Sequence, residues 1–378
     1  MSAISDDIQP FRIEIPQAEL DYLHARLAGA RWPGELPGPG WTRGIPLDYL
    51  EELAGYWRTG YDWRAAEARL NAYPQFTTEI DGQCIGFLHV RSGQPGAKPL
   101  LITHGYPSSV AEFLELIEPL VNPAAGQAFH VVAPSLPGYT FSTPLSGAGW
   151  TMGRTAAAWA ELMRRLGYQR YGVHGGDVGA GVSGLVAGLD GEHVTGVHVV
   201  TDPLTAAAVA TFIPGMAENL DPNDPADKLI LERMDAFRGE GSGYLAIQNS
   251  RPQTIGYGLT DSPLLQLAWI AEKVHEWTDL PVDRDQLLTT VSLYWFTGSG
   301  ASAAHTLYDQ AHASLLLGAP PAVPQGFAVF GADETVRKLV PAPAGAHWTE
   351  FSHGKHFPAM EAPADLAADL RAFFGALE

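Results

Sequence analysis

The sequence predicts an α/β protein with a mainly parallel sheet, a helical lid insertion and a helical N-terminal extension. From about residue 76, short apolar runs alternate with helical stretches, which is typical of a parallel sheet covered on both faces. This rhythm stops near residue 204 and resumes near residue 319, while the segment before residue 76 has helical periodicity. The expected divisions are an extension at 1–75, a first core part at 76–203, a lid at 204–318 and a second core part at 319–378.

The N-terminal extension is expected to contain two amphipathic helices. In "QAELDYLHARLAGARWP", Leu20, Leu23 and Leu27 lie on one helical stripe, and Pro33 is expected to end that helix. "PLDYLEELAGYWRTGYDW" predicts the second helix. Its tryptophans and tyrosines indicate a packing surface that wraps around a core, not a cofactor site.

The core segment begins with a predicted hairpin. "FTTEIDGQCIGFLHV" alternates apolar and polar residues around Asp81-Gly82, a strong turn signal. Three strand–helix pairs and one further strand then follow. They are "PLLITHG" with a helix at about 109–120, "FHVVAPS" with a helix at about 154–167, "RYGVHGG" with a helix from about 178, and "VTGVHVV".

The insertion at 204–318 is helical and loop-rich, with Pro, Gly and scattered Trp and Tyr, and has no clear buried strand. After it, "GFAVFGADE" and "AHWTEFSHG" predict two more strands, and "PADLAADLRAFFGAL" predicts a terminal amphipathic helix. A core interrupted in this way is typical of a hydrolase with a lid.

Charge and composition exclude several classes of partner. A net charge of −19 argues against binding to nucleic acid and to an anionic membrane surface. The single cysteine, Cys84, excludes an intrachain disulfide and gives no support for secretion. The N-terminal residues lack the features of a signal peptide, and no apolar run approaches the length of a spanning helix. We therefore expect a soluble, cytoplasmic protein.

The stretch "GVHGGDVGAGVSG" at 172–184 permits two interpretations. Gly179, Gly181 and Gly184 match a dinucleotide-binding fingerprint, and Asp202 lies near the offset expected for a ribose-binding acid. However, the predicted strand ends near Gly175, so these glycines follow the turn instead of forming the phosphate loop itself. Glycines on a helix beside a sheet are more often explained by close packing.

The second interpretation is a nucleophile elbow with Asp177 at its apex. Such a turn strains the backbone and needs small neighbours, which Gly175, Gly176 and Gly179 supply. The turn would lift the carboxylate above the carboxyl ends of the strands, where sites of open α/β sheets form. On this loop alone, a simple helix-capping aspartate is an equal alternative.

Other segments favour the elbow. "THGYPSS" follows an early strand, so the backbone N–H of Tyr106 could join that of Val178 in an oxyanion hole. His356 follows the last predicted strand, and Asp333 follows the strand before it. The chain order nucleophile, acid, histidine is that of the α/β-hydrolase fold. His347, His353 and His356 lack the spacing of a zinc site, so no metal is expected.

These residues resemble those of microsomal-type epoxide hydrolases over nearly the whole chain. "FRIEIPQAELDYLHARLAGARWP" and "YWRTGYDWRAAEARLNAYPQF" match that family's N-terminal segment, and the HGYP, GGD and terminal histidine motifs match its core. The resemblance implies an α/β-hydrolase fold and opening of an epoxide to a vicinal diol without metal or organic cofactor. It also implies a role for each matched residue: Asp177 as nucleophile, His356 as base, Asp333 (with Glu334 as second choice) as orienting acid, and Tyr244 and Tyr308 as the lid tyrosines that polarise the epoxide oxygen.

The sequence departs from the family pattern where Val178 replaces the usual tryptophan after the nucleophile, which leaves the pocket shape and substrate preference open. It also lacks the membrane anchor of the mammalian enzymes and so resembles a soluble bacterial branch. A dehalogenase-like reaction, an epoxide-opening cyclase and a non-catalytic binding protein remain alternatives. The oligomeric state stays open, with a homodimer as one candidate.

Overall fold

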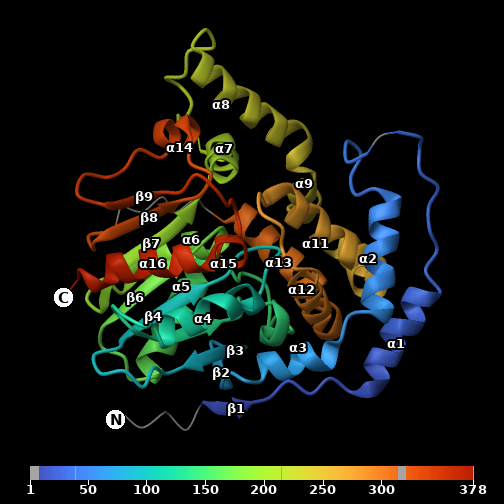
Figure 1. The fold of residues 1–378 in the computed structure, drawn as a ribbon, viewed down its shortest axis with the longest axis horizontal. Helices are drawn as coiled ribbons and strands as arrows, with labels where there is room; N and C mark the ends of the chain where they lie inside the picture. Colours follow the sequence, from blue (N-terminus) through green and yellow to red (C-terminus); the bar gives the residue numbers. More distant parts are fainter. Residues whose placement is uncertain (1–7, 39, 214, 314–320, 378) are drawn as a thin grey trace.

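The structure is a computed structural model that describes residues 8–38, 40–213, 215–313 and 321–377. Its centre is a nine-stranded sheet (Figure 1). In chain order the strands are β1 (Gln9–Phe11), β2 (Gln75–Ile80), β3 (Gln83–Val90), β4 (Lys98–Thr103), β5 (Phe129–Pro134), β6 (Tyr171–Gly175), β7 (Val194–Thr201), β8 (Gln325–Val329) and β9 (His347–Glu350).

The sheet is parallel where the site forms and antiparallel at one side. The strand order is β1-β2-β3-β5-β4-β6-β7-β8-β9, and every pair from β5 to β9 is parallel. The strands β1, β2 and β3 are antiparallel to their neighbours. The hairpin predicted at Asp81-Gly82 joins β2 to β3, with both residues at positive φ.

Helices cover both faces of the sheet because alternate strand residues point to opposite sides. Leu100 and Ile102 of β4 pack in one core with α4 (Leu114–Val121), α15 (Pro358–Glu361) and α16 (Pro363–Gly375). Leu101, between them, joins the other core with α5 (Met152–Arg165) and α6 (Val178–Leu189). Figure 1 shows α4 and α16 in front of the strands. The predicted α/β-hydrolase architecture is therefore confirmed.

Among the described residues between β7 and β8, helices and loops are present and strands are absent. These helices are α7 (Pro203–Phe212), α8 (Pro225–Ala236), η3 (Phe237–Gly241), α9 (Gly243–Gln248), α10 (Pro252–Asp261), α11 (Pro263–Trp277), α12 (Arg284–Thr297) and α13 (Ser299–His312). The short elements η1 (Val110–Phe113), η2 (Thr140–Ser142) and α14 (Glu334–Leu339) belong to the core segments. The predicted boundary at 318/319 lies outside the described residues, as do residues 1–7 of the extension. Within the described ranges, no helix combines the length and apolar composition needed to cross a bilayer.

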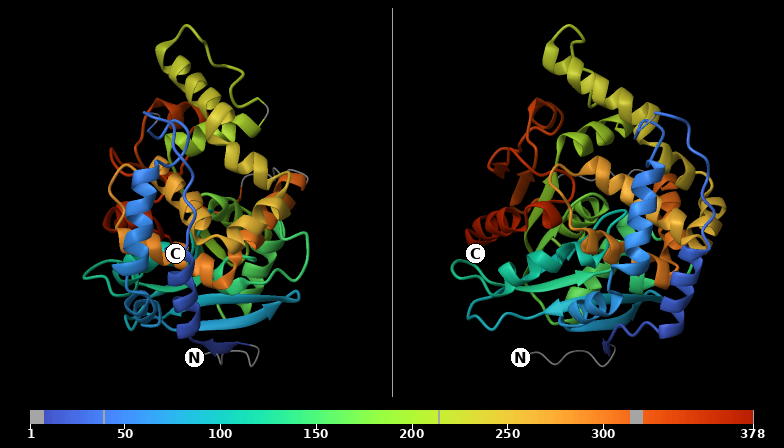
Figure 2. Two further views of the ribbon diagram at one scale, coloured as in Figure 1. Left: turned by 90° about the vertical axis from the view of Figure 1, so that its right-hand side faces the viewer. Right: turned by 45° about the vertical axis from the view of Figure 1, so that its right-hand side comes forward.

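The extension contains α1 (Gln17–Ala28), α2 (Leu47–Thr59) and α3 (Trp63–Leu70). The first helix ends at Ala28, earlier than Pro33, and Gly29 caps it. The extension also contributes β1, which the helical periodicity did not predict, to the edge of the sheet. Figures 1 and 2 show α1 and α2 on the outer side of the lid helix α11, so the extension covers the lid.

Three aromatic side chains of the extension make polar contacts with α12. Trp57 Nε1 donates a buried hydrogen bond to Ser292 Oγ at 2.9 Å. Tyr56 donates to the Asp285 carboxylate at 2.8 Å. The Tyr61 hydroxyl lies 3.0 Å from the Thr289 hydroxyl. The aromatic residues are thus a packing surface, and they tie the extension to the lid.

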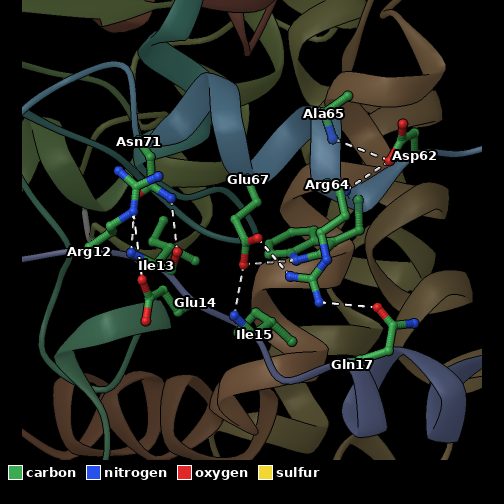
Figure 3. Close-up of polar contacts among 11 residues, drawn as sticks. Arg12, Ile13, Glu14, Ile15, Gln17, Asp62, Arg64, Ala65, Glu67 and Asn71 are labelled. Carbon is green, nitrogen blue, oxygen red and sulfur yellow. Dashed lines mark hydrogen bonds and ion pairs between the residues drawn. The ribbon is translucent and has the colours of Figure 1, made fainter.

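The extended segment between β1 and α1 is fastened to α3 by side-chain to backbone hydrogen bonds (Figure 3). Asn71 accepts from Ile13 N at 2.9 Å and donates to Ile13 O at 2.8 Å. Glu67 accepts from Ile15 N at 2.7 Å. Among the described residues this segment has no neighbouring strand, so its backbone N–H and C=O groups form hydrogen bonds with the side chains of Asn71 and Glu67 instead.

Replacing Asn71 by alanine is expected to lower the free energy of unfolding by about 2 kcal/mol, because the buried Ile13 peptide loses a donor and an acceptor. Urea titration followed by circular dichroism measures the change. Gln17→Ala is the control, since Gln17 meets only the exposed Arg64 and Asp21, and its effect is expected to stay within about 0.5 kcal/mol. Equal effects of the two changes would contradict this prediction.

Candidate active site

Asp177 lies at the turn between β6 and α6 with a strained backbone, φ 51° and ψ −128°. The turn fits only because its neighbours lack side chains. A Cβ atom on Gly175 would lie 2.3 Å from Gly179 C, and one on Gly179 would lie 2.0 Å from Thr103 O. The glycines therefore allow α6 to approach β4 closely. This arrangement has the geometry of the elbow that the sequence predicts around Asp177.

The remaining glycines of the dinucleotide-like motif lie on α6, past the turn. A Cβ atom on Gly181 would lie 2.5 Å from Met152 Sδ, so Gly181 allows close packing of α5 on α6. Gly184 has open space around it. Close packing, which the sequence favoured, thus explains Gly179 and Gly181, whereas Gly184 has no close neighbour in the described part of the chain.

The Asp177 carboxylate receives a hydrogen bond from the loop after β4. Tyr106 N donates to Asp177 Oδ1 at 2.8 Å. Gly105 permits this approach, since a Cβ atom there would lie 2.4 Å from Asp177 Cβ. Trp269 Nε1 in α11 donates to the Tyr106 hydroxyl at 2.7 Å and so holds that side chain in place. Val178 N is the first backbone N–H of α6, where anions are stabilised.

His356 lies beside Asp177 on one side of its ring and beside Asp202 on the other. The distance from His356 Nε2 to Asp177 Oδ2 is 3.6 Å. His356 Nδ1 lies 3.3 Å from Asp202 Oδ2 and 3.0 Å from Thr205 Oγ1. Both His356 and Asp202 are almost fully buried, while the Asp177 side chain is 28% exposed. The nucleophile candidate therefore faces the open side of this group.

Asp202 is held firmly by the first turn of α7. Its Oδ1 atom accepts hydrogen bonds from Leu204 N at 2.8 Å and Thr205 N at 3.1 Å. Its Oδ2 atom accepts a short hydrogen bond from the Thr205 hydroxyl. Because Asp202 already has these partners, its carboxylate is fixed in the orientation that meets His356.

The structure corrects the expectation that Asp333 orients His356. Asp333 caps α14 through Thr335 N at 2.8 Å and forms an ion pair with Arg233 at 2.5 Å. The second choice, Glu334, pairs with Arg337 at 2.6 Å. The Asp333 carboxylate is thus engaged by α14 and Arg233, whereas Nδ1 of His356 lies beside Asp202.

Asp202, which the sequence does not single out as a partner of the histidine, is the carboxylate that lies beside His356 Nδ1. The signal was present in the sequence, because Asp202 directly follows the strand "VTGVHVVT". The carboxyl ends of parallel strands share one edge of the sheet. A residue that directly follows β7, such as Asp202, therefore lies at the same edge as Asp177. In the sequence, Asp202 matches only the offset expected for a ribose-binding acid.

Of the two predicted lid tyrosines, the structure brings Tyr244 to the site. Tyr244 is partly buried, and its ring stacks on that of Tyr106 with centroids 5.9 Å apart and planes 1° from parallel. The ring of Tyr308 instead stacks on His312 in the same helix, with centroids 4.0 Å apart. Its neighbour Leu307 lines the site cavity. The expectation for Tyr308 is therefore not met in this conformation.

A cavity of ≈ 170 Å³ opens above Asp177. Apart from Asp177, His356, Tyr106, Tyr244 and Thr205, its wall is apolar, and Trp277 of the lid contributes to it. His356 N donates to Trp277 O at 3.1 Å, so the lid also positions the histidine loop. The remaining wall residues are Val178, Leu204, Ala208, Val209, Phe212, Phe237, Leu245 and Leu307.

Electrostatics favour a charged histidine beside Asp177. Burial works to lower the pKa of His356, but Asp202, Asp177 and Glu112 together raise it to about 9. Burial likewise opposes charge on Asp202, yet its bond to His356 holds the pKa of that carboxyl below its usual value. Burial raises the pKa of Glu112, a carboxyl near the pair, to about 7. Burial and the charge of Asp177 raise the pKa of Tyr244 well above its usual value, so its hydroxyl keeps its proton.

The three C-terminal histidines contact different carboxylates. His347 contacts Asp369 at 2.8 Å, His353 contacts Asp365 at 2.8 Å, and His356 joins the site. His104 is buried and accepts from Leu136 N at 3.1 Å, which makes it a structural residue.

Comparisons with known proteins agree with this architecture. A family model described as "Epoxide hydrolase N terminus" matches residues 8–113, and one described as "alpha/beta hydrolase fold" matches residues 98–246. A Stigmatella aurantiaca protein named "Putative epoxide hydrolase" is 42% identical over 390 residues, which cover 97% of this chain and 84% of that protein. Epoxide hydrolase 1 of Sus scrofa is 33% identical over 416 residues, which cover 100% of this chain and 90% of that protein.

Solved structures give the same result. The structure of the Aspergillus niger epoxide hydrolase matches with a TM-score of 0.82 at 31% sequence identity. The match covers 99% of this chain and 98% of that one. The similarity therefore includes the extension and the lid as well as the core.

Replacing Asp202 by asparagine is expected to lower the pKa of His356 from about 9, because the carboxylate that bonds to Nδ1 loses its charge. Two-dimensional NMR of the imidazole during a pH titration measures this. Asp333→Asn is the matched control, and the His356 titration is expected to stay in place, since Asp333 pairs with Arg233. A shift with Asp333→Asn and none with Asp202→Asn would reverse the assignment.

Proposed function

Because the chain belongs to the epoxide hydrolase family, we propose that it hydrolyses a small-molecule epoxide to a vicinal diol through an ester on Asp177. One observation carries the proposal: a carboxylate on a strained elbow shares one mainly apolar cavity with an imidazole and the partly buried phenol of Tyr244. A carboxylate can open a strained epoxide ring, provided that the departing oxygen receives a proton.

In the first step, an oxygen of Asp177 attacks one ring carbon and the carbon–oxygen bond of the epoxide breaks. Tyr244 gives its proton to the oxygen that is released, and the resulting phenolate takes the proton that His356 holds in the resting enzyme. The products of this step are a hydroxyalkyl ester on Asp177, a neutral His356 and a restored Tyr244. The ion pair of charged His356 and Asp177 is thus the starting state.

In the second step, neutral His356 removes a proton from water, which attacks the carbonyl carbon of the Asp177 ester. The oxyanion is stabilised by the backbone N–H groups of Tyr106 and Val178, where one lost donor typically costs about 2.7–4 kcal/mol of barrier. Collapse releases the diol, and the proton on His356 passes to the departing alkoxide. The new Asp177 carboxyl then returns its proton to His356, which restores the ion pair.

Esterification itself prepares His356 to act as a base. The negative charge of Asp177 is one of the groups that raise the His356 pKa to about 9. The ester has no such charge, so the His356 pKa falls when the intermediate forms. Asp202 remains charged, holds the Nδ1–H tautomer and stabilises the imidazolium during hydrolysis.

The alternatives differ in measurable products. A dehalogenase-like reaction would need a halide-binding N–H beside the nucleophile, and Val178 offers only a hydrocarbon side chain there. An epoxide-opening cyclase would give a product without oxygen from labelled water. A non-catalytic binding protein would form no ester. A cytoplasmic location and a homodimer stay predictions from the sequence.

Replacing His356 by glutamine is expected to trap the ester, because attack by Asp177 does not require a base while hydrolysis does. Intact-mass spectrometry after incubation with an epoxide should show one adduct, and peptide mapping should place it on Asp177. The control Asp177→Ala should show none. An unmodified His356→Gln protein, with a substrate that the wild type consumes, would overturn the mechanism.

Replacing Tyr244 by phenylalanine is expected to slow ester formation about 100-fold, because the departing oxygen loses its proton donor. Stopped-flow measurement of the alkylation step separates this from hydrolysis. Tyr308→Phe is the matched control and should change the rate by no more than about twofold, since its ring packs against His312. An equal loss in both variants would show that Tyr308 turns into the cavity during the reaction.

A further inference from the structure

Two side chains of the site separate it from a second cavity. Val178 and Leu307 line the ≈ 170 Å³ cavity above Asp177 and also line a neighbouring cavity of ≈ 60 Å³. Val178 is the residue directly after the nucleophile, so this partition lies beside the reacting carboxylate. The other residues of the second cavity are Leu136, Pro137, Tyr139, Trp150, Met152, Thr155, Thr306 and Gln310.

The second cavity is lined mainly by hydrocarbon, and three of its polar side chains have protein partners. Trp150 Nε1 donates to Ser146 Oγ at 3.2 Å, Gln310 Oε1 accepts from Met152 N at 2.8 Å, and the Thr306 hydroxyl donates to Ala303 O at 2.8 Å. A group that enters this cavity therefore meets mainly carbon, and an apolar group is favoured there.

The two volumes differ in the groups that they can hold. A closed cavity of about 150 Å³ is large enough for benzene, so the site cavity accepts a ring-sized apolar group. The second cavity has room for about two water molecules, which corresponds to a short alkyl group. An oxirane in contact with Asp177 lies at this partition, so a substituent on one ring carbon stays in the site cavity. The partly buried Leu307 side chain has to turn aside for a substituent on the other carbon to enter the second cavity.

We propose that the cavity behind Val178 and Leu307 is a second substrate subsite, which binds a short alkyl group on the oxirane carbon that does not carry the ring-sized substituent. This subsite rests on the proposed function. It makes the preferred substrate class an epoxide with two apolar substituents of unequal size, one on each ring carbon.

The test compares kcat/KM for styrene oxide, for its β-methyl derivative in both geometric isomers, and for stilbene oxide, whose second ring exceeds the small cavity. Thr155→Leu fills the second cavity from α5. It is expected to lower kcat/KM for the preferred β-methyl isomer about tenfold relative to styrene oxide. Ala208→Leu is the matched control because it adds carbon atoms to the site cavity instead, and it should slow both substrates alike.

A second variant keeps the proposal testable if Thr155→Leu does not fold. Leu307→Ala removes part of the partition and is expected to raise kcat/KM for stilbene oxide about tenfold relative to styrene oxide. If Thr155→Leu slows styrene oxide and both β-methyl isomers equally, or Leu307→Ala leaves the ratio unchanged, the subsite is overturned while hydrolysis stands. If the wild type consumes none of these epoxides and forms no adduct as His356→Gln, the proposed function fails as well.

Discussion

The site depends on the strained backbone at Asp177, whose φ of 51° is unfavourable for any residue with a side chain. This conformation turns the carboxylate away from the sheet and toward the lid. It persists because Gly105, Gly175 and Gly179 let the loop after β4, the end of β6 and the start of α6 approach within distances that a Cβ atom would prevent. The same approach brings Tyr106 N within 2.8 Å of the carboxylate. Gly179, one of the glycines that suggest nucleotide binding, therefore serves the geometry of the turn at Asp177.

Charge is the second constraint. Asp177, Asp202 and Glu112 surround one imidazole, and burial makes their mutual interactions strong. In the resting state this arrangement keeps His356 protonated and pairs it with Asp177. A histidine that is already protonated cannot accept a proton from water, so it could not act as a base in a hydrolysis without a covalent step. Here the covalent step removes the charge that holds the proton, so the histidine becomes basic when an ester is present to be hydrolysed.

The extension and the lid connect to this site through α11. The helices α1 and α2 pack against α11, and Trp57 bonds to Ser292 of the adjacent α12. In turn, α11 supplies Trp269, which holds Tyr106, and Trp277, whose carbonyl accepts from His356 N. The N-terminal segment thus supports the helix that contacts both the Tyr106 loop and the His356 loop. This explains why an aromatic-rich extension accompanies the core.

The sequence by itself determined the order of the strands and helices, the elbow at Asp177, the Tyr106 loop and the terminal His356. Each of these features depends on a short contiguous segment, in which local requirements such as a glycine at a tight turn can be recognised. Only the tertiary structure decided which carboxylate lies beside His356, because Asp202 and Asp333 both follow strands and their contacts depend on how the following helices pack. It also decided between Tyr244 and Tyr308, since the direction of a side chain on a lid helix depends on how that helix packs. The partition by Val178 and Leu307 likewise joins residues 129 positions apart, which no local pattern reveals.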